Sequence, residues 1–364
     1  MREAIRNCTD YAGMAKRIFI KQGMPLHIVF FVTSRCSLRC RHCYYSNRLN
    51  NSDQELTIDE IAKIARSLPH LLSISFSGGE PFARKDLYRI VELFLTHCRP
   101  KYIQFPTNGL LTADIIATLE KVLEASGSAR VIVNLSIDGT EDIHDAIRGR
   151  KGSFKKCLET MDALKRLKRR YPALSIYTAT TCMSENENNL QELFDLIVKD
   201  MEPENIGINL VRSPVAEEAL KDLDINNYKR FYESKRRYMK SRRLGLRERI
   251  VLAKELMESE FIADAYSKGE YSTPCYAANL FGLIDEKGEV FPCLLRDNSL
   301  GSLRDPDIGY DMKRIWSSKR ASKEREDIRK QRCYCTYECC MTTSILFNIK
   351  NLSRLAFGLA RIRF

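Results

Sequence analysis

The sequence lacks any long hydrophobic run. No apolar stretch in its 364 residues approaches the roughly 20 residues that a membrane-spanning helix needs. The first residues contain no continuous apolar stretch, and Glu3 and Asp10 stand among their basic residues, so they do not form a secretory signal. Internal repeats and low-complexity segments are also absent. These absences argue against an exported or membrane-spanning protein, and we expect a cytoplasmic location.

Recognised nucleic-acid-binding motifs are missing as well. The formal net charge is +12, but the basic residues are scattered over several expected helices, so we expect no nucleic-acid partner. A positive surface suits an acidic redox partner or an anionic membrane face. Hydrophobic residues make up 44% of the chain, enough for a sizeable core in two or three domains or in one large barrel with an appendage.

Cysteine, in contrast, is abundant, with thirteen residues. Disulfides are a poor explanation, because the number is odd, the chain is large, no export signal is present and most cysteines stand in two tight groups. Clustered cysteines in a protein of this kind favour metal binding. Four cysteines stand alone and are expected to be ordinary buried thiols: Cys8, Cys98, Cys157 and Cys182.

Strands and helices alternate over the first half of the chain. Six short runs rich in Ile, Val and Phe are expected to be buried parallel strands: 27–33, 72–76, 102–106, 131–137, 175–181 and 206–211. Five helical patterns lie between them: 57–68, 85–97, 112–125, 155–170 and 187–200. This order predicts an α/β fold, a partial (β/α)6 TIM-like barrel, although a doubly wound sheet has the same local pattern.

We expect five segments along the chain. They are an N-terminal helical segment (1–26), the barrel (27–215), a basic helical linker (216–270), a cysteine-rich α+β extension (271–343) and a C-terminal helix (344–364). In the linker, helical over 222–260, the basic residues are expected to form a solvated face: Lys235, Arg236, Arg237, Lys240, Arg242 and Arg243. In the extension, Asp285-Glu286-Lys287-Gly288 predicts a hairpin turn.

The first group of cysteines directly follows the first expected strand, as Cys36-Ser-Leu-Arg-Cys40-Arg-His-Cys43. Three thiolates within eight residues can surround one iron–sulfur cubane but ligate only three of its irons. One iron keeps an open position, which distinguishes a reactive metal site from a structural one. Zinc is the alternative, with His42 as a fourth ligand, although zinc sites usually use paired Cys-x2-Cys.

This spacing resembles the defining motif of the radical S-adenosylmethionine (radical SAM) superfamily. The resemblance implies a 4Fe-4S cluster on Cys36, Cys40 and Cys43, whose open iron chelates the methionine moiety of S-adenosylmethionine. Relatives usually have an aromatic residue before the last cysteine, where this sequence has His42. Its imidazole either packs near the adenine or caps backbone groups as an ordinary loop histidine.

Further motifs follow in the order that the family has them. Gly78-Gly79-Glu80-Pro81 resembles the GGEP motif; paired glycines let backbone approach a ligand, and Glu80 accepts from the methionine ammonium. Asn108 follows the third strand, as in many relatives. By position, Ser136 contacts the cofactor and Arg148 its carboxylate; alternatively, Arg148 forms a surface salt bridge.

These residues stand at the carboxyl ends of expected strands, where barrel active sites lie. The resemblance covers most of residues 27–212. The sixth strand departs from the family pattern, and Asn209 or Arg212 is only a weak candidate for contact with the cofactor.

The second group of cysteines resembles the opening of SPASM and "twitch" extensions, in the pattern Cys-x12-Gly-x4-Cys. No cysteine follows Cys340, and the Cys-x2-Cys-x5-Cys-x3-Cys run of a full SPASM domain is absent. The resemblance therefore implies one auxiliary 4Fe-4S cluster, with an open iron or with these ligands: Cys275, Cys293, Cys333, Cys335 and Cys339. A structural zinc site is the alternative. Trp316 resembles part of the short helix that relatives place before their last cysteines.

The resemblance implies reductive cleavage of S-adenosylmethionine to a 5′-deoxyadenosyl radical, with flavodoxin or ferredoxin as the reductant. We expect oxidation or bond formation in peptide or protein maturation, since SPASM-type relatives commonly modify peptides. About 25 residues precede the barrel, too few for a leader-binding domain, so a separate peptide-recognition protein is expected. The alternatives are a lipid-linked, sugar or other small-molecule substrate at a membrane surface, or a non-enzyme: an iron–sulfur electron carrier or a degenerate SAM-binding protein.

The C-terminal segment from Ile345 to Phe364 has no acidic residue. Its helical pattern places Lys350, Arg354 and Arg361 on one face and several apolar residues opposite them. Such a helix either lies in a membrane interface, which would make the protein peripherally membrane-associated, or docks on the barrel.

Overall fold

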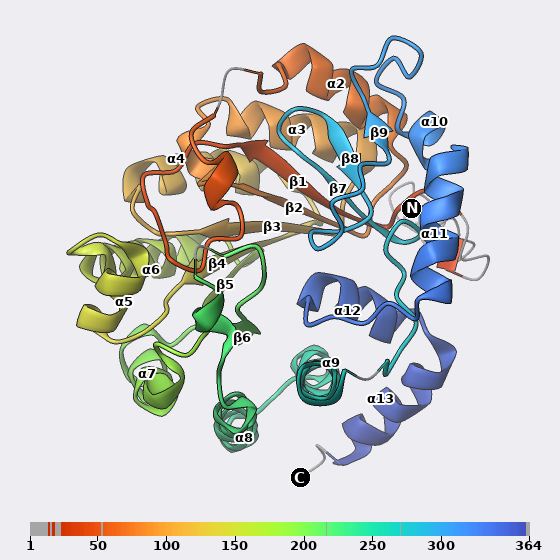
Figure 1. Cartoon of the computed structure of the whole chain (residues 1–364). Coiled ribbons are helices and arrows are strands. Elements are labelled where there is room, and N and C mark those ends of the chain that lie inside the picture. Colours follow the sequence, from red (N-terminus) through yellow and green to blue (C-terminus); the bar gives the residue numbers. More distant parts are fainter. Residues whose placement is uncertain are drawn as a thin grey trace.

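The computed structural model describes residues 14, 17–18, 23–51, 54–215, 217–269 and 271–361. Most of the expected N-terminal helical segment, Cys8 and the last three residues of the chain lie outside the described residues. Figure 1 shows the arrangement of the helices and strands.

One nine-stranded sheet organises the described residues, in the order β6-β5-β4-β3-β2-β1-β7-β8-β9. Six neighbouring strands are parallel, as the alternating pattern predicted: β1 (His27–Thr33), β2 (Ser73–Gly78), β3 (Tyr102–Thr107), β4 (Arg130–Ser136), β5 (Leu174–Cys182) and β6 (Asn205–Leu210). The sheet curves but does not close, since β6 and β9 are its two edges. The expected partial barrel is confirmed, and the doubly wound alternative is not.

Helices cover the outer face of the curved sheet (Figure 1). They are α2 (Ile58–Ser67), α3 (Leu87–Cys98), α4 (Thr112–Ala125), α5 (Glu141–Arg148), α6 (Ser153–Arg170) and α7 (Leu190–Leu196). The side chain of Thr57 caps α2 in a capping box with Glu60. The sequence did not predict α5, because its eight residues offer only a short apolar pattern, with Ile143 and Ile147.

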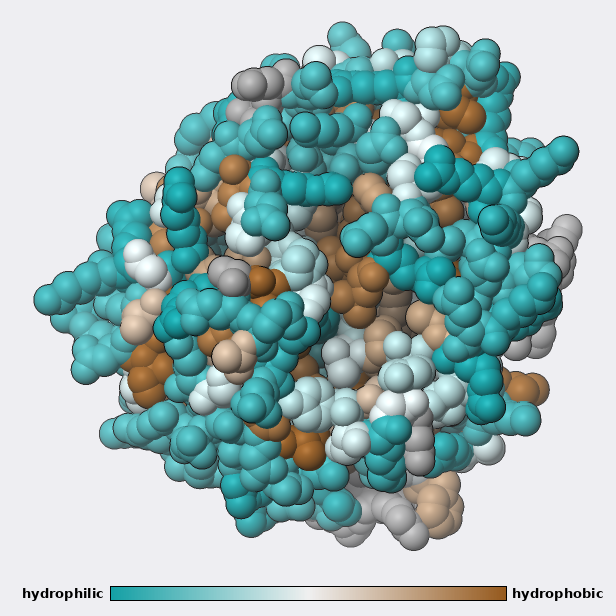
Figure 2. Space-filling model, in the orientation of Figure 1, coloured by the Kyte–Doolittle hydropathy of each residue, from teal (hydrophilic) through white to brown (hydrophobic). Residues whose placement is uncertain are grey.

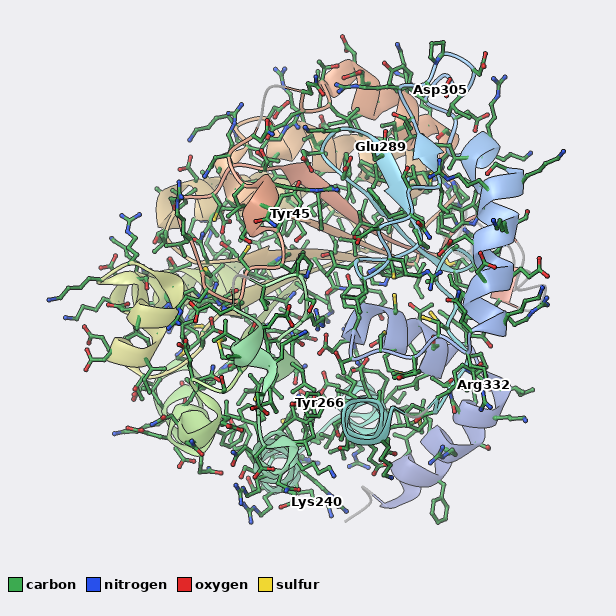
Figure 3. All side chains as sticks on the ribbon, viewed as in Figure 1. Tyr45, Lys240, Tyr266, Glu289, Asp305 and Arg332 are labelled. Carbon is green, nitrogen blue, oxygen red and sulfur yellow. The ribbon has the colours of Figure 1, made fainter. Side chains whose placement is uncertain are left out.

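The cysteine-rich part of the chain joins the same sheet. The expected hairpin is present as β7 (Phe281–Ile284) and β8 (Glu289–Phe291), followed by a short β9 (Gly301–Ser302). β7 pairs in parallel with β1, so the hairpin of the cysteine-rich extension is hydrogen-bonded directly to the first strand of the barrel. The turn also contacts the loop after β1, where the Tyr45 hydroxyl donates to the carboxylate of Glu286. Figure 3 shows Tyr45 on that loop.

The remaining helices lie beyond the hairpin or on the open side of the barrel (Figure 1). They are α8 (Ile225–Ser241), α9 (Leu246–Lys268), α10 (Met312–Trp316), α11 (Lys319–Lys330), α12 (Glu338–Leu346) and α13 (Ile349–Arg361). Trp316 ends the short helix that was expected around it. No helix within the described ranges is both long enough and apolar enough to cross a membrane.

The basic linker differs from the prediction at one residue. Lys235 is 1% exposed rather than solvated, and its Nζ donates to the backbone oxygen of Ile206 and to Glu255. Arg236, Arg237 and Arg243 are exposed as expected, while Lys240 and Arg242 are half-buried. Lys235 is buried because α9 supplies Glu255 as a partner for its charge, which a helical pattern alone cannot indicate.

The C-terminal region forms two helices rather than one. Ile345 belongs to α12 and is buried, whereas α13 begins at Ile349, after a break at which Asn348 accepts from the backbone N–H of Lys350. The helix α13 packs along α9 with Asn351 and Leu355 buried. The docking face is therefore not the apolar face that the sequence pattern indicated, because Ile349 and Leu352 remain exposed.

Candidate functional site

The three cysteines of the first group lie in the loop that leaves the carboxyl end of β1. Burial is the largest cause that raises the pKa of the Cys43 thiol to about 12, and the nearby thiols of Cys40 and Cys36 contribute to that rise. Burial is also the largest cause of the raised pKa values of Cys36 and Cys40. Since thiolates are the metal ligands, a bound cluster would displace protons from all three residues.

Two glycines let the cysteine loop pack against the end of β2. Gly78 has a φ of +116°, and a Cβ atom there would lie 2.3 Å from the backbone oxygen of Thr33. A Cβ atom on Gly79 would lie 2.4 Å from the backbone oxygen of Arg35. Side chains at either position would push the loop outward, so the pair of glycines is needed for this close approach.

Glu80 is buried directly beyond these glycines. Its carboxylate accepts from Thr107 Oγ1 at 2.9 Å and from the backbone N–H of Asn108 at 2.8 Å. Burial raises the pKa of Glu80 to about 7, although these hydrogen bonds act in the opposite direction. The side chain of Asn108 in turn donates from Nδ2 to the Sγ of Cys36 at 3.7 Å. The GGEP-like stretch and the end of β3 therefore meet beside the cysteines.

Arg148, the last residue of α5, reaches the same cysteines from the other side. Its Nη1 donates to the Sγ of Cys40 at 3.7 Å, and its Nη2 lies 2.6 Å from the Oδ2 of Asp138. Arg148 is 6% exposed and Asp138 is fully buried, so this is not the surface salt bridge that was the alternative for Arg148. Burial lowers the pKa of Arg148, but Asp138 and the neighbouring thiols of Cys40 and Cys157 together raise it overall.

His42 lies beside this ion pair. Its Nε2 lies 3.8 Å from the Oδ2 of Asp138, while its buried Nδ1 has no hydrogen-bond partner among the described residues. Burial lowers the pKa of His42 to about 4, so the imidazole is neutral at pH 7. Neither nitrogen caps a backbone group in the described part of the chain, which leaves Nδ1 available to a ligand.

The other predicted residues lie at the ends of β4 and β6. Ser136 ends β4 and is half-buried, so it stands at the correct end of the sheet. Asn209 lies on β6, and Arg212 follows that strand and pairs with Glu338 of α12. Asp138 was not singled out from the sequence, although its position two residues after β4 is a usable signal.

The arrangement fits a three-cysteine iron–sulfur cluster with a small zwitterionic ligand beside it. Asn108 and Arg148 donate to cysteine sulfurs, as groups around Fe–S clusters commonly do. The carboxylate of Glu80 can accept from an ammonium group, and the buried Nε of Arg148 has no hydrogen-bond partner in the described structure. Residues of opposite charge are thus present for both ends of an amino acid moiety.

Comparison with family models decides the assignment. Residues 30–197 match the model of the Radical SAM superfamily. This part of the chain is a radical SAM domain. The matched region contains the three cysteines and every candidate cofactor residue of this radical SAM domain.

Curated relatives of the chain include proteins with peptide-related names. The PqqA peptide cyclase of Bradyrhizobium diazoefficiens is 34% identical over 140 residues, which cover 38% of this chain and 35% of that protein. The sporulation killing factor maturation protein SkfB of Bacillus subtilis is 28% identical over 291 residues, 77% of this chain and 63% of that protein. In both cases the match spans less than two thirds of the relative.

Solved structures of the same fold include anSMEcpe with bound AdoMet, with a TM-score of 0.61 and 16% identity, covering 93% of this chain and 98% of that chain. SuiB of Streptococcus suis, bound to its precursor peptide SuiA, has a TM-score of 0.58 and 16% identity, covering 89% of this chain and 72% of SuiB. At these identities the likeness shows the fold alone.

The second group of cysteines includes residues on both sides of the β7–β8 hairpin, since Cys275 precedes β7 and Cys293 follows β8. Cys275 lies in hydrogen-bond contact with Cys333, and Cys293 with Cys340. The contact with Cys275 is the largest cause that lowers the pKa of Cys333, to about 6. A small hollow is lined by four of these thiols, together with neighbouring residues: Cys275, Cys333, Cys335 and Cys340.

Cys339 and Cys340 face different surroundings. The two residues are consecutive on α12, so their side chains point about 100° apart around the helix. Cys340 meets Cys293, whereas Cys339 lies near Arg212, which lowers the pKa that burial raises. The sequence pattern predicted Cys339 as a cluster ligand and not Cys340. Two consecutive cysteines on one helix cannot both face the same cluster, and this was the available indication that one of them is not a ligand.

Zinc was the alternative for both cysteine groups. A zinc ion needs its ligands about 2.3 Å from one point. Across the described parts of the chain, no three His, Cys, Asp or Glu side chains form a group that could hold a single metal ion. Ligands of a cubane attach to different irons and need not converge on one point.

Proposed function

We propose that the protein is a radical SAM enzyme that cleaves S-adenosylmethionine reductively and abstracts hydrogen from a peptide or protein substrate, for oxidation or bond formation during maturation. The observation that carries the proposal is the shell around Cys36, Cys40 and Cys43. Glu80 and Arg148 surround these thiols with charges suited to a bound amino acid moiety.

Each candidate residue has a separate role in this proposal. Cys36, Cys40 and Cys43 hold a 4Fe-4S cluster. The cofactor contacts are assigned to these residues: His42, Gly78, Gly79, Glu80, Asn108, Ser136 and Arg148. When bound, the cluster and S-adenosylmethionine supply a low-potential electron and a 5′-deoxyadenosyl radical. The side chains of these cofactor-binding residues position the methionine moiety and keep water away from it.

The second cysteine group is proposed to hold one auxiliary 4Fe-4S cluster. Cys275 and Cys293 are two of its ligands, and the others come from Cys333, Cys335 and Cys340, with Cys339 as the remaining candidate from the sequence. The support is the thiol–thiol contacts of Cys275 with Cys333 and of Cys293 with Cys340. These contacts connect three segments that are far apart in the sequence.

A peptide substrate is supported by the relatives. One is named a peptide cyclase, another a maturation protein, and SuiB was solved with its precursor peptide. Figure 2 shows the open side of the barrel, where the surface is hollowed near its centre and hydrophobic residues gather. A separate peptide-recognition protein and an acidic flavodoxin or ferredoxin are the proposed partners; the net charge of +12 would steer the latter. The proposed location is the cytoplasm.

A second candidate is the same chemistry on a lipid-linked or other small-molecule substrate at a membrane. The exposed apolar side chains of Ile349 and Leu352 favour it. A simple electron carrier is not favoured, because such a protein has no use for a buried carboxylate and a buried guanidinium beside the open side of its cluster.

The test is anaerobic reconstitution, followed by iron and sulfide analysis and by 5′-deoxyadenosine release after addition of S-adenosylmethionine and dithionite. About eight irons per chain with release supports both clusters, and about four supports the first alone. Cys43→Ala should abolish release but keep the iron of the second group, whereas Cys98→Ala, at an isolated buried thiol, should keep both. Release by Cys43→Ala at the wild-type rate would refute the assigned roles.

A further inference from the structure

Exposed hydrophobic side chains are concentrated on two helices. Among the described residues, seven large hydrophobic side chains are exposed, and six of them lie on α9 or α13. Tyr266 is one of the six, and the five aliphatic or phenyl side chains are Leu246 (73%), Ile250 (37%), Ile349 (75%), Leu352 (45%) and Phe357 (61%). We call this surface the α9–α13 edge. Single exposed apolar residues are ordinary, but a concentration of this kind marks an interaction surface.

The two helices lie side by side, because α13 packs along α9. Gly358 lies against Ala253, since a Cβ atom on Gly358 would be 3.9 Å from that of Ala253. Four residues earlier on α13, the guanidinium of Arg354 lies 5.1 Å over the ring of Phe261. The helices are therefore antiparallel, and α13 runs toward the start of α9. Leu246 and Ile250 share a face of α9 with Ala253 at i, i+4 and i+7 spacing.

The docked side of α13 is distinct from the exposed one. Asn351 and Leu355 are buried, and Asn351 donates from Nδ2 to the hydroxyl of Thr273 at 2.8 Å. Ile349 and Leu352 lie outside this docked face. The packing that holds α13 in place is thus already complete without these apolar side chains, which are left for another surface.

Two stretches beside the edge contain basic residues but no acidic ones. Residues 234–247, from the end of α8 to the start of α9, contain seven lysines and arginines, of which only Lys235 is buried in an ion pair. Residues 345–364 contain four arginines and lysines and no acidic residue. Figure 3 shows Lys240 at the lower rim of the molecule, on the side where Figure 1 places α8, α9 and α13.

A cavity of about 450 Å³ opens at the same edge and is lined in part by Leu246 and Arg247. The acidic residues in its lining are occupied: Glu204 pairs with Lys168, Glu255 pairs with Lys235, and Glu248 accepts from the backbone of Gly245. Arg247, in contrast, lies over the ring of Tyr102. The lining has three basic residues, Arg130, Lys168 and Arg247, and three acidic ones, so the cavity adds no net charge to the edge.

We propose that the α9–α13 edge binds the surface of an anionic lipid bilayer. The apolar side chains would enter the boundary between headgroups and acyl chains, and the flanking lysines and arginines would contact anionic headgroups. A bilayer fits better than an acidic protein, because the exposed apolar side chains of Ile349 and Leu352 lie outside the docked face of α13, in a segment whose charged residues are all basic. This inference is independent of the radical chemistry.

The experiment is co-sedimentation of the full chain with vesicles of phosphatidylcholine alone or mixed with phosphatidylglycerol. The wild type should sediment with the anionic vesicles and be released at high salt. The double variant Ile349→Glu/Leu352→Glu should bind these vesicles about tenfold less, since it replaces apolar contacts by like charges. Arg242→Ala/Arg243→Ala should lose binding to a similar extent, about tenfold.

A matched control removes two positive charges elsewhere. Lys155→Ala/Lys156→Ala changes exposed residues of α6 and should bind as the wild type does. Equal binding of all variants, or no binding of the wild type to anionic vesicles, would overturn the proposal. If an acidic flavodoxin instead binds the wild type and not Arg242→Ala/Arg243→Ala, the edge docks a protein. Deoxyadenosine release by Ile349→Glu/Leu352→Glu should be unchanged, which separates this inference from the proposed function.

Discussion

The Nη1 of Arg148 lies 3.7 Å from the Sγ of Cys40 and forms a hydrogen bond with that sulfur. The other end of the guanidinium holds Asp138 at 2.6 Å. One side chain thus connects the cysteine loop after β1 with the end of β4, two segments about 100 residues apart. Because the pair is buried, removal of either partner leaves an uncompensated charge.

Arg148→Ala should lower 5′-deoxyadenosine release about 10- to 100-fold, the range for groups that orient metal ligands. The reason is the loss of the hydrogen bond to Cys40 together with the loss of the positive charge that pairs with the buried carboxylate of Asp138. The assay is the reconstituted protein with dithionite, with iron measured in parallel. Arg150→Ala, at an exposed position two residues away, should release deoxyadenosine at the wild-type rate. Equal losses in both variants would show that the effect is not specific to Arg148.

Gly79→Ala should destabilise the cysteine loop. The new Cβ atom would lie 2.4 Å from the backbone oxygen of Arg35, and backbone cannot rotate away as a side chain can. We expect a loss of about 1–3 kcal/mol in the free energy of unfolding, measured in urea, and a lower iron content at the first site.

Gly358→Ala is the control for this substitution. Its Cβ atom would lie 3.9 Å from that of Ala253, which is ordinary contact, within a helix. Since alanine favours helix more than glycine does, we expect a gain of up to about 1 kcal/mol. A wild-type stability of Gly79→Ala would contradict the close packing described for the loop.

Cys340→Ala should reduce the iron of the second cysteine group, while Cys339→Ala should leave more of it in place. Cys340 contacts Cys293, whereas the neighbours of Cys339 include Arg212. Iron per chain and the absorbance of the reconstituted protein are measured in a Cys43→Ala background, so that only the second group contributes. A larger loss of iron in Cys339→Ala than in Cys340→Ala would reverse the ligand assignment.

The contact between Glu60 and Arg304 should make stability depend on pH. Arg304 bonds both carboxylate oxygens of Glu60 at 2.8 Å, and this contact is the largest cause that lowers the pKa of Glu60 to about 2. A carboxyl group with a lowered folded-state pKa stabilises the fold above its unfolded pKa of about 4.5. That contribution disappears as the pH falls from about 4.5 toward 2.

Glu60→Gln should therefore be less stable than the wild type by about 2 kcal/mol at pH 7, the cost of a hydrogen bond to a charged group. The difference should shrink as the pH falls below about 4.5, when the wild type also loses the charge. Urea unfolding at several pH values measures both. Glu92→Gln, at an exposed position on α3, should show no such trend. A constant difference between pH 7 and pH 3 would contradict the role of the ion pair.

The sequence by itself determined the alternation of strands and helices and the location of the first cysteine group. All six expected strands lie within two residues of the observed ones, because each is a buried apolar run whose hydrogen bonds only a sheet can satisfy. The cysteine loop and the Gly78-Gly79-Glu80 stretch follow neighbouring strands, so their approach was predictable once the strands were parallel. Local spacing carries this information.

Only the tertiary structure decided which side chains face one another. Asp138 became the partner of Arg148 because α5, a helix too short to predict, returns its last residue to the end of β4. Lys235 became buried because α9 supplies Glu255. In both cases a buried charge is paired with a residue of another element. The periodicity of the sequence does not predict which residue that is.

The same limit applies to the cysteines and to the last helix. Whether Cys339 or Cys340 meets Cys293 depends on the rotation of α12 about its axis, which is set by the residues that pack against it. The helix α13 docks through Asn351 and Leu355 rather than through its most apolar face, because the shape and hydrogen-bond partners of α9 and its neighbours select that side. Amphipathicity follows from the sequence, but the partner of each face is decided by packing over distances that the sequence pattern does not encode.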